Sequence, residues 1–154
     1  MATNVSRSAF RAASPSETSH RERDWGRFIP LVGRVLFSGI FLMTILGHFS
    51  SKTIGYAASQ GVPLANLLVP LSGIIATLGG LSIALGYRAK IGAWLVVLFL
   101  VPVTLTLHAF WAVADPQMAQ MQQVMFMKNL SILGGALLIA YFGAGPLSLD
   151  SRSR

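Results

Sequence analysis

The chain has 154 residues, of which 53% are hydrophobic and 11% charged, and its formal net charge is +7. A soluble domain of this size carries about 25% charged residues, so the composition indicates a membrane protein. The absence of cysteine excludes disulfides, thiol redox chemistry and thiolate metal sites, and no soluble basic domain remains that could bind nucleic acid.

The first 27 residues are rich in Ser, Arg and Ala and show no apolar periodicity, which predicts a disordered tail over residues 1–27. The apolar run that follows begins too late and is too long for a cleaved signal peptide. An organelle transit peptide remains an alternative because Arg and Ser are abundant, although Glu17, Glu22 and Asp24 argue against it.

Four apolar segments follow, each near the 20 residues that a helix needs to cross a hydrocarbon core of about 30 Å. The predicted spans cover residues 28–49, 64–86, 91–114 and 125–144, joined by residues 50–63, 87–90 and 115–124. The four-residue joint makes spans two and three a tight antiparallel pair. We therefore expect an all-α bundle of four transmembrane helices over residues 28–149 and a short tail over residues 150–154.

Lysine and arginine lie mainly on one side of these spans. That side carries Arg7, Arg11, Arg21, Arg23, Arg27, Arg88, Lys90, Arg152 and Arg154. The loops on the opposite side carry only Lys52. The positive-inside rule therefore places both termini and the short joint in the cytoplasm, and we expect a multi-pass protein of the plasma membrane, the inner membrane of a bacterium.

Spans two and four share a Leu-Gly-Gly pattern at residues 78–80 and 133–135, and spans one and three both end in a histidine followed closely by phenylalanine. The pattern favours two similar helical hairpins in parallel repeat. The alternative is that the glycine pairs only allow close approach between helices, as in many membrane bundles.

Polar side chains at membrane depth are costly, so they are candidates for a functional site. His48 and Lys52 are four residues apart and share a face if the helix continues, and a rise of 1.5 Å per residue brings His48, His108 and Lys128 to similar depths near the outer ends of their spans. The candidate ligand-binding residues are Lys128, His108, Asn129, Lys52, His48 and Trp111.

The chemistry of this group limits its ligand. It contains no carboxylate, so hard cations are poor candidates, and two imidazoles beside Lys128 lack a third ligand for zinc, so no metal is expected. A quinone headgroup or a lipid phosphate fits better. Three alternatives stay open: Lys52 snorkels to the outer headgroups, Trp111 belongs to an aromatic belt, and the histidines only fix helix packing.

Arg34 lies about two turns into span one from the cytoplasmic side. Its long stem could snorkel to the inner surface. The alternative is an ion pair with Asp150, the only acidic residue that follows Asp115. We expect Arg34 to approach either Asp150 or the carbonyl groups of residues 143–147.

These residues resemble the DoxX family of small four-span membrane proteins over about residues 30–150. The resemblance rests on Arg34, Gly47, Lys52 and the segments 61–63, 86–88, 108–111, 126–130, 134–135 and 143–150. Its candidate site residues are Arg34, Lys52, His108, Lys128, Asn129 and Asp150.

The resemblance to DoxX implies a quinone-linked or redox accessory subunit that works with a membrane or soluble oxidoreductase. Thr77 departs from the pattern, because many members carry Glu there, and this weakens a proton-coupled function. The alternative is a non-catalytic scaffold or a component associated with lipid or transport. Whether the chain forms a homo-oligomer in the lipid bilayer is left open.

Overall fold

The computed structural model describes residues 25–152, and that range is all helical, without strands. Four stretches are long and apolar enough to cross a membrane, which confirms the predicted fold class. Residues 1–24 and 153–154 of the two predicted tails lie outside the described residues. The elements are α2 (Phe28–Met43), η1 (Ile45–Phe49), α3 (Ser51–Ser59), α4 (Ala65–Leu85), α5 (Ala89–Leu107), η2 (Phe110–Ala112), α6 (Pro116–Phe142) and α7 (Leu149–Arg152).

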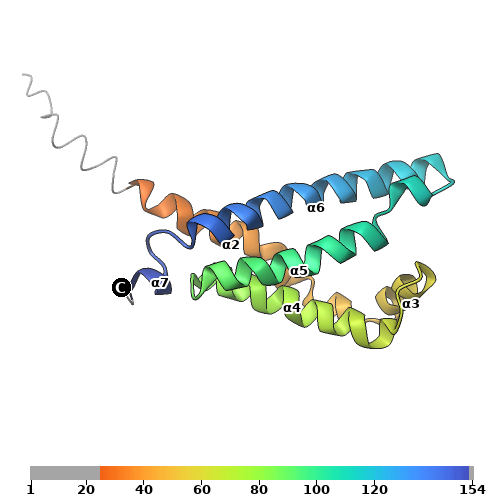
Figure 1. Ribbon diagram of the computed structural model, residues 1–154, viewed down its shortest axis with the longest axis horizontal. Helices are drawn as coiled ribbons and strands as arrows, with labels where there is room; N and C mark the ends of the chain where they lie inside the picture. The colour runs from red at the N-terminus through yellow and green to blue at the C-terminus, as the bar shows by residue number, and fades with distance from the viewer. Residues whose placement is uncertain (1–24, 153–154) are drawn as a thin grey trace, which may run out of the picture.

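The long helices form an elongated bundle in which α4 packs between α2 and α5, and α5 packs between α4 and α6. The start of α2, the α4–α5 turn and α7 lie at one end of the bundle, on the left of Figure 1. The short helix α3 and the α5–α6 connection lie at the opposite end. These are called the inner end and the outer end below.

Small residues bring the central helices close together. A Cβ atom on Gly79 would lie 2.8 Å from the carbonyl oxygen of Gly92, and one on Gly80 would lie 3.0 Å from the Cβ of Phe41. The buried residues of α2 are Arg34, Ser38 and Phe41, spaced so that they form one stripe of the helix. Gly79 and Gly80, the glycines of the first Leu-Gly-Gly pattern, therefore allow close packing between helices, which is the second of the two interpretations of that pattern.

The turn between α4 and α5 is as tight as the four-residue joint predicted. Gly86 and Arg88 adopt left-handed backbone conformations, with φ of 62° and 48°. The backbone N–H of Tyr87 donates to the carbonyl of Ser82, and the Ser82 hydroxyl donates back to the carbonyl of Tyr87 at 2.6 Å. This closure holds α4 and α5 as an antiparallel pair.

The first span ends at Phe49, as predicted, and the third ends at Ala112, two residues before the predicted end, but in both the regular α-helix stops earlier. The α-helix of span one stops at Met43, and Ser50 then adopts an extended conformation and caps α3 by accepting from the backbone N–H of Thr53. The helix does not continue through Ser50, so the condition under which His48 and Lys52 would share one helical face is not met. Likewise α5 ends at Leu107, so His108 and Trp111 do not continue its face.

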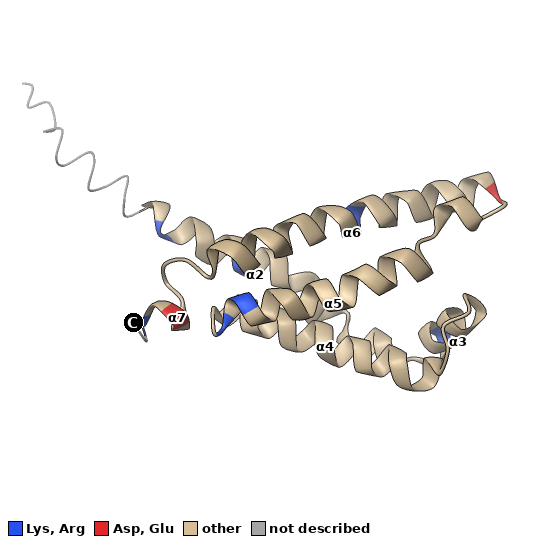
Figure 2. Ribbon diagram, in the orientation of Figure 1, with Lys and Arg blue, Asp and Glu red and all other residues tan. Residues whose placement is uncertain are grey.

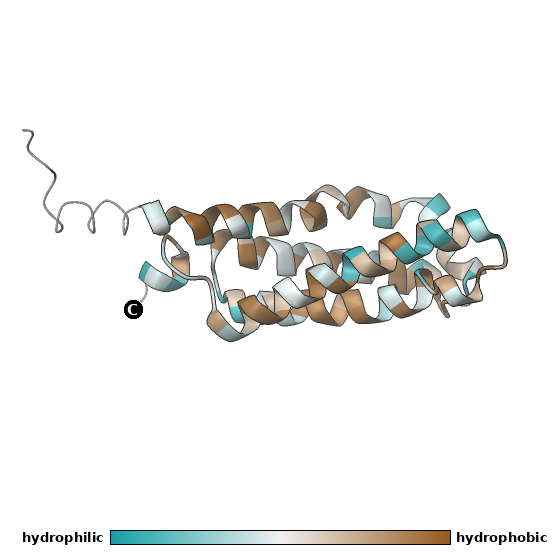
Figure 3. Ribbon diagram, turned by 90° about the horizontal axis from the view of Figure 1, so that it is seen from above, coloured by the Kyte–Doolittle hydropathy of each residue, from teal (hydrophilic) through white to brown (hydrophobic). Residues whose placement is uncertain are grey.

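The fourth helix begins at Pro116, well before the predicted residue 125. Asp115 caps it by accepting from the backbone N–H of Met118 at 2.8 Å, and Pro116 occupies its first turn. The 27 residues of α6 span about 40 Å, more than the hydrocarbon core requires. Hydrophilic residues gather in its outer turns (Figure 3), so the helix extends beyond its apolar part.

Candidate functional site

Arg34 is the most buried cation of the described bundle, with 4% of its surface exposed. Its guanidinium donates from Nη1 to the carbonyl of Ala144 and from Nη2 to the carbonyl of Leu147 at 2.7 Å, and Nη1 also lies 3.5 Å from the carbonyl of Pro146. This is one of the two arrangements expected from the sequence. Arg34 thus holds the segment that follows α6 against the first span.

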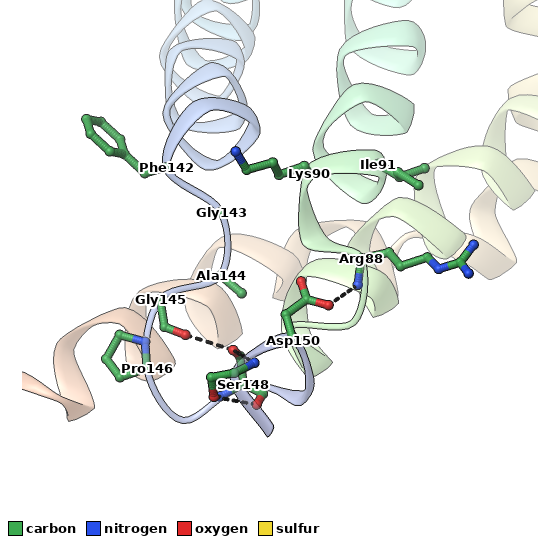
Figure 4. A pocket seen from close by; sticks show the side chains of 11 residues that line it. Arg88, Lys90, Ile91, Phe142, Gly143, Ala144, Gly145, Pro146, Ser148 and Asp150 are labelled. Atoms are coloured by element: carbon green, nitrogen blue, oxygen red, sulfur yellow. Dashed lines mark hydrogen bonds between the residues drawn. The ribbon is translucent and has the colours of Figure 1, made fainter. Parts of the chain in front are cut away.

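Asp150 fastens the same segment to a different part of the fold. Its carboxylate accepts from the backbone N–H groups of Arg88 at 2.7 Å and Ala89 at 3.1 Å, at the beginning of α5 (Figure 4). Its own backbone N–H donates to the carbonyl of Gly86. Asp150 therefore serves as the cap of α5 and ties the segment after α6 to the α4–α5 turn.

Gly86 is required where this segment crosses the α4–α5 turn. It has a positive φ of 62°, and a Cβ atom there would lie 2.4 Å from the Cβ of Ser148. The close crossing leaves a pocket of about 730 Å³ at the inner end, which is called the inner pocket below. It is lined by Arg88, Lys90, Ile91, Phe142, Gly143, Ala144, Gly145, Pro146, Ser148, Asp150 and Ser151.

At the outer end, His108 belongs to a chain of hydrogen bonds. Its Nδ1 lies 2.7 Å from Oε1 of Gln122, whose amide nitrogen donates to the hydroxyl of Tyr56 at 3.0 Å. The Tyr56 hydroxyl in turn donates to the carbonyl of Leu107 at 3.3 Å. Gln122 and Tyr56 were not predicted, because their contact depends on α3 folding back toward α6.

The other outer candidates differ in exposure and make few contacts with one another. Lys128 is exposed, and its ammonium contacts only the sulfur of Met125, at 3.4 Å, among the described residues. Asn129 is buried on the same helix, and Lys52 is exposed on α3 (Figure 2). Trp111 is 60% exposed and packs against the rings of Phe110 and Phe126, an arrangement typical of an interfacial aromatic belt.

His48 packs against α4 and borders a second cavity. A Cβ atom on Gly73 would lie 2.5 Å from the Cβ of His48, so this contact depends on glycine. The His48 ring lies 5.7 Å from the ring of Phe99, and its Nδ1 lies 3.0 Å from the carbonyl of Thr44.

This second cavity, called the outer cavity, has a volume of about 450 Å³. It is lined by His48, Thr53, Ala57, Gly61, Val62, Pro63, Leu68, Val69, Leu71, Ser72, Ile75, Leu98, Phe99, Pro102, Val103, Thr106 and Leu107. Of the six candidate ligand-binding residues, only His48 lines it. Neither the inner pocket nor the outer cavity therefore gathers the predicted constellation. Within residues 25–152 there is also no group of three His, Asp or Glu that could hold a metal ion.

The comparisons with known proteins identify a different family from the one expected. The model of the SURF4 family matches residues 3–154. The inner membrane protein YqjF of Escherichia coli is 32% identical over 126 residues, which cover 78% of this chain and 88% of YqjF. The inner membrane protein YphA of the same organism is 26% identical, over 84% of this chain and 95% of YphA.

A eukaryotic relative covers a smaller part of both sequences. The ER-derived vesicles protein ERV29 of Saccharomyces cerevisiae is 34% identical over 71 residues, which are 46% of this chain and 23% of ERV29. No solved structure matches.

The family match overturns the resemblance to DoxX and, with it, the quinone-linked redox function. Some residues of that resemblance have a structural use here: Arg34 binds backbone carbonyls, and Gly86 lets the segment after α6 cross the α4–α5 turn. This multi-pass membrane protein belongs to the SURF4 family.

Proposed function

We propose that this protein is a non-catalytic, transport-associated membrane component that holds an acyl chain in its outer cavity. The observation that carries the proposal is the chemistry of that cavity, whose walls are mostly Leu, Val, Ile, Phe and Pro side chains. Its volume of about 450 Å³ lies within the usual range of pockets for small ligands.

The polar side chains of the outer cavity are already bonded to the protein. The hydroxyl of Ser72 donates to the carbonyl of Val69, and that of Thr106 donates to the carbonyl of Pro102, both at 2.7 Å. The Thr53 hydroxyl lies 2.8 Å from that of Ser50. Because these groups are used within their own segments, the cavity favours a hydrocarbon chain over a polar headgroup.

The membrane location and orientation support this function. YqjF and YphA are inner membrane proteins. The start of α2, the α4–α5 turn and α7, which lie at the inner end (Figure 1), carry Arg27, Arg34, Arg88, Lys90 and Arg152. We infer an inner-membrane protein with both termini in the cytoplasm, which places the outer cavity at the level of the outer leaflet. The vesicle-protein name of ERV29 favours a role in transport over one in redox chemistry.

The arrangement of titratable groups supports a non-catalytic role. The imidazole of His108 is held by Gln122, at the junction of α5 and α6, whereas that of His48 packs against α4 and Phe99. General acid–base or nucleophilic catalysis needs such groups within hydrogen-bond reach of one another and of a substrate. Here the polar groups instead connect helices.

Photolabelling with a phospholipid whose acyl chain carries a diazirine tests the proposal. We expect crosslinks in the segments that line the outer cavity, and we expect Ser72→Phe to remove them by filling the space. Ile74→Phe is the matched control, because it adds the same ring on the same helix at a residue that is 43% exposed and does not line the cavity. Crosslinks that persist in Ser72→Phe, or that map only to lipid-facing surfaces, would contradict the proposed function.

A further inference from the structure

The inner pocket has an exposed cation on one wall. Lys90 is exposed in the first turn of α5 and makes no ion pair within the described residues. Figure 4 shows its side chain extending from α5 toward the end of α6, beside Gly143 and Phe142. A Cβ atom on Gly143 would lie 3.4 Å from the Cε of Lys90, so the lysine stem runs close beside the residue that ends α6.

The acidic and hydroxyl groups of the inner pocket are bonded to the backbone of the protein. The carboxylate of Asp150 accepts from the backbone N–H groups of Arg88 and Ala89. The hydroxyl of Ser148 donates to the carbonyl of Gly145, and that of Ser151 donates to the carbonyl of Ser148. The pocket therefore presents the positive charge of Lys90, while its one carboxylate is engaged by the beginning of α5.

The other wall of the inner pocket is apolar and faces outward from the bundle. Ile91 is 56% exposed and Phe142 is 74% exposed. Trp94 is 58% exposed and follows Lys90 by one helical turn, so the two side chains lie on the same face of α5. A cation at headgroup level, next to apolar side chains that contact the hydrocarbon, suits a molecule with an anionic head and acyl tails.

We propose that the inner pocket binds a phosphoanion, carried by an anionic phospholipid of the cytoplasmic leaflet, with Lys90 as its charged contact. The phosphate lies against the ammonium of Lys90, and the acyl chains run along Ile91 and Phe142. Basic pockets between transmembrane helices at the cytoplasmic surface recognise lipid headgroups in this way. Arg88 is not the contact, because its guanidinium lies over the ring of Tyr87 and extends away from the segment after α6 (Figure 4).

The test uses the purified full chain in a neutral detergent, with native mass spectrometry to measure the binding of phosphatidylglycerol and phosphatidylcholine. We expect phosphatidylglycerol to bind more tightly, and Lys90→Gln to weaken its binding about fivefold or more. Lys90→Arg should retain the binding. Lys52→Gln is the matched control, because it removes an exposed lysine at the opposite end.

The competing outcomes are distinct. Equal binding of phosphatidylglycerol to the wild type and to Lys90→Gln, or equal binding of the two lipids, would overturn the proposal. Competition by inorganic phosphate identifies the source of the anion. If inorganic phosphate displaces phosphatidylglycerol from the wild type and this displacement depends on Lys90, the site binds the free anion. If inorganic phosphate does not displace it, the site requires the lipid. The inner pocket lies at the opposite end from the outer cavity, so Ser72→Phe should leave this binding unchanged.

Discussion

Replacing Arg34 with leucine should release the segment that follows α6 while leaving the four long helices in place. The guanidinium donates to the carbonyls of Ala144 and Leu147, and leucine can donate to neither. The carbonyl of Ala144 is buried with its residue, which is 6% exposed, so water has little access to replace the lost bond.

The size of the effect follows from these contacts. Two hydrogen bonds from a charged donor contribute about 1.5–3 kcal/mol each. Leucine offsets about 1–2 kcal/mol of this, because it removes a buried cation whose Nε has no partner among the described residues. The segment should therefore lose about 1–5 kcal/mol of local stability, which raises its open population roughly 5- to 4,000-fold.

Hydrogen exchange measured by mass spectrometry would detect this opening in peptides that cover residues 143–152. Arg88→Leu is the control, because it removes an arginine at the same end whose guanidinium contacts only the Tyr87 ring within the described residues. Arg34→Lys should lie between the two, since a single ammonium cannot reproduce the guanidinium fork. Exchange in this segment that is the same for Arg34→Leu and Arg88→Leu would refute the reasoning.

Three further changes test other contacts. Gly73→Val should force its side chain into His48 and lower the free energy of unfolding by about 1–3 kcal/mol. Adding His48→Gly, which removes both the Cβ and the ring that the valine meets, should recover part of this loss in a thermal unfolding assay; no recovery would contradict the contact. Asp150→Ala should cost about 0.5–2 kcal/mol by removing the cap of α5, visible as faster hydrogen exchange in the first turn of that helix. Gln122→Leu should break the link to Tyr56 and widen the distance distribution between spin labels on α3 and α6, at cysteines introduced into this cysteine-free chain; an unchanged distribution would show that the link does not hold α3.

Much of the fold could be predicted from the sequence where hydropathy and turn chemistry agree. The predicted span 64–86 differs from α4, Ala65–Leu85, by one residue at each end, because Leu64 and Gly86 adopt left-handed conformations that end the helix. The contact between Arg34 and the carbonyls of residues 143–147 was also foreseeable, since a buried cation at the membrane interface needs acceptors nearby.

The outer end was less predictable because hydropathy does not show where a helix breaks or extends. The outer turns of α6 are polar and were assigned to a loop, although Asp115 followed by Pro116 is a helix-start signal. The break before Ser50 separates His48 from Lys52, and no spacing rule detects it without the cap geometry. The outer cavity is built from several separate segments, so it could be found only in three dimensions.

The contacts of Arg34 also impose an order on assembly. Its acceptors, the carbonyls of Ala144 and Leu147, are synthesised more than a hundred residues after the arginine itself. During that interval the first three spans enter the bilayer with a guanidinium that has only water or headgroups as partners. The fold becomes complete when the last of the four spans is inserted and the residues after it turn back beneath the first.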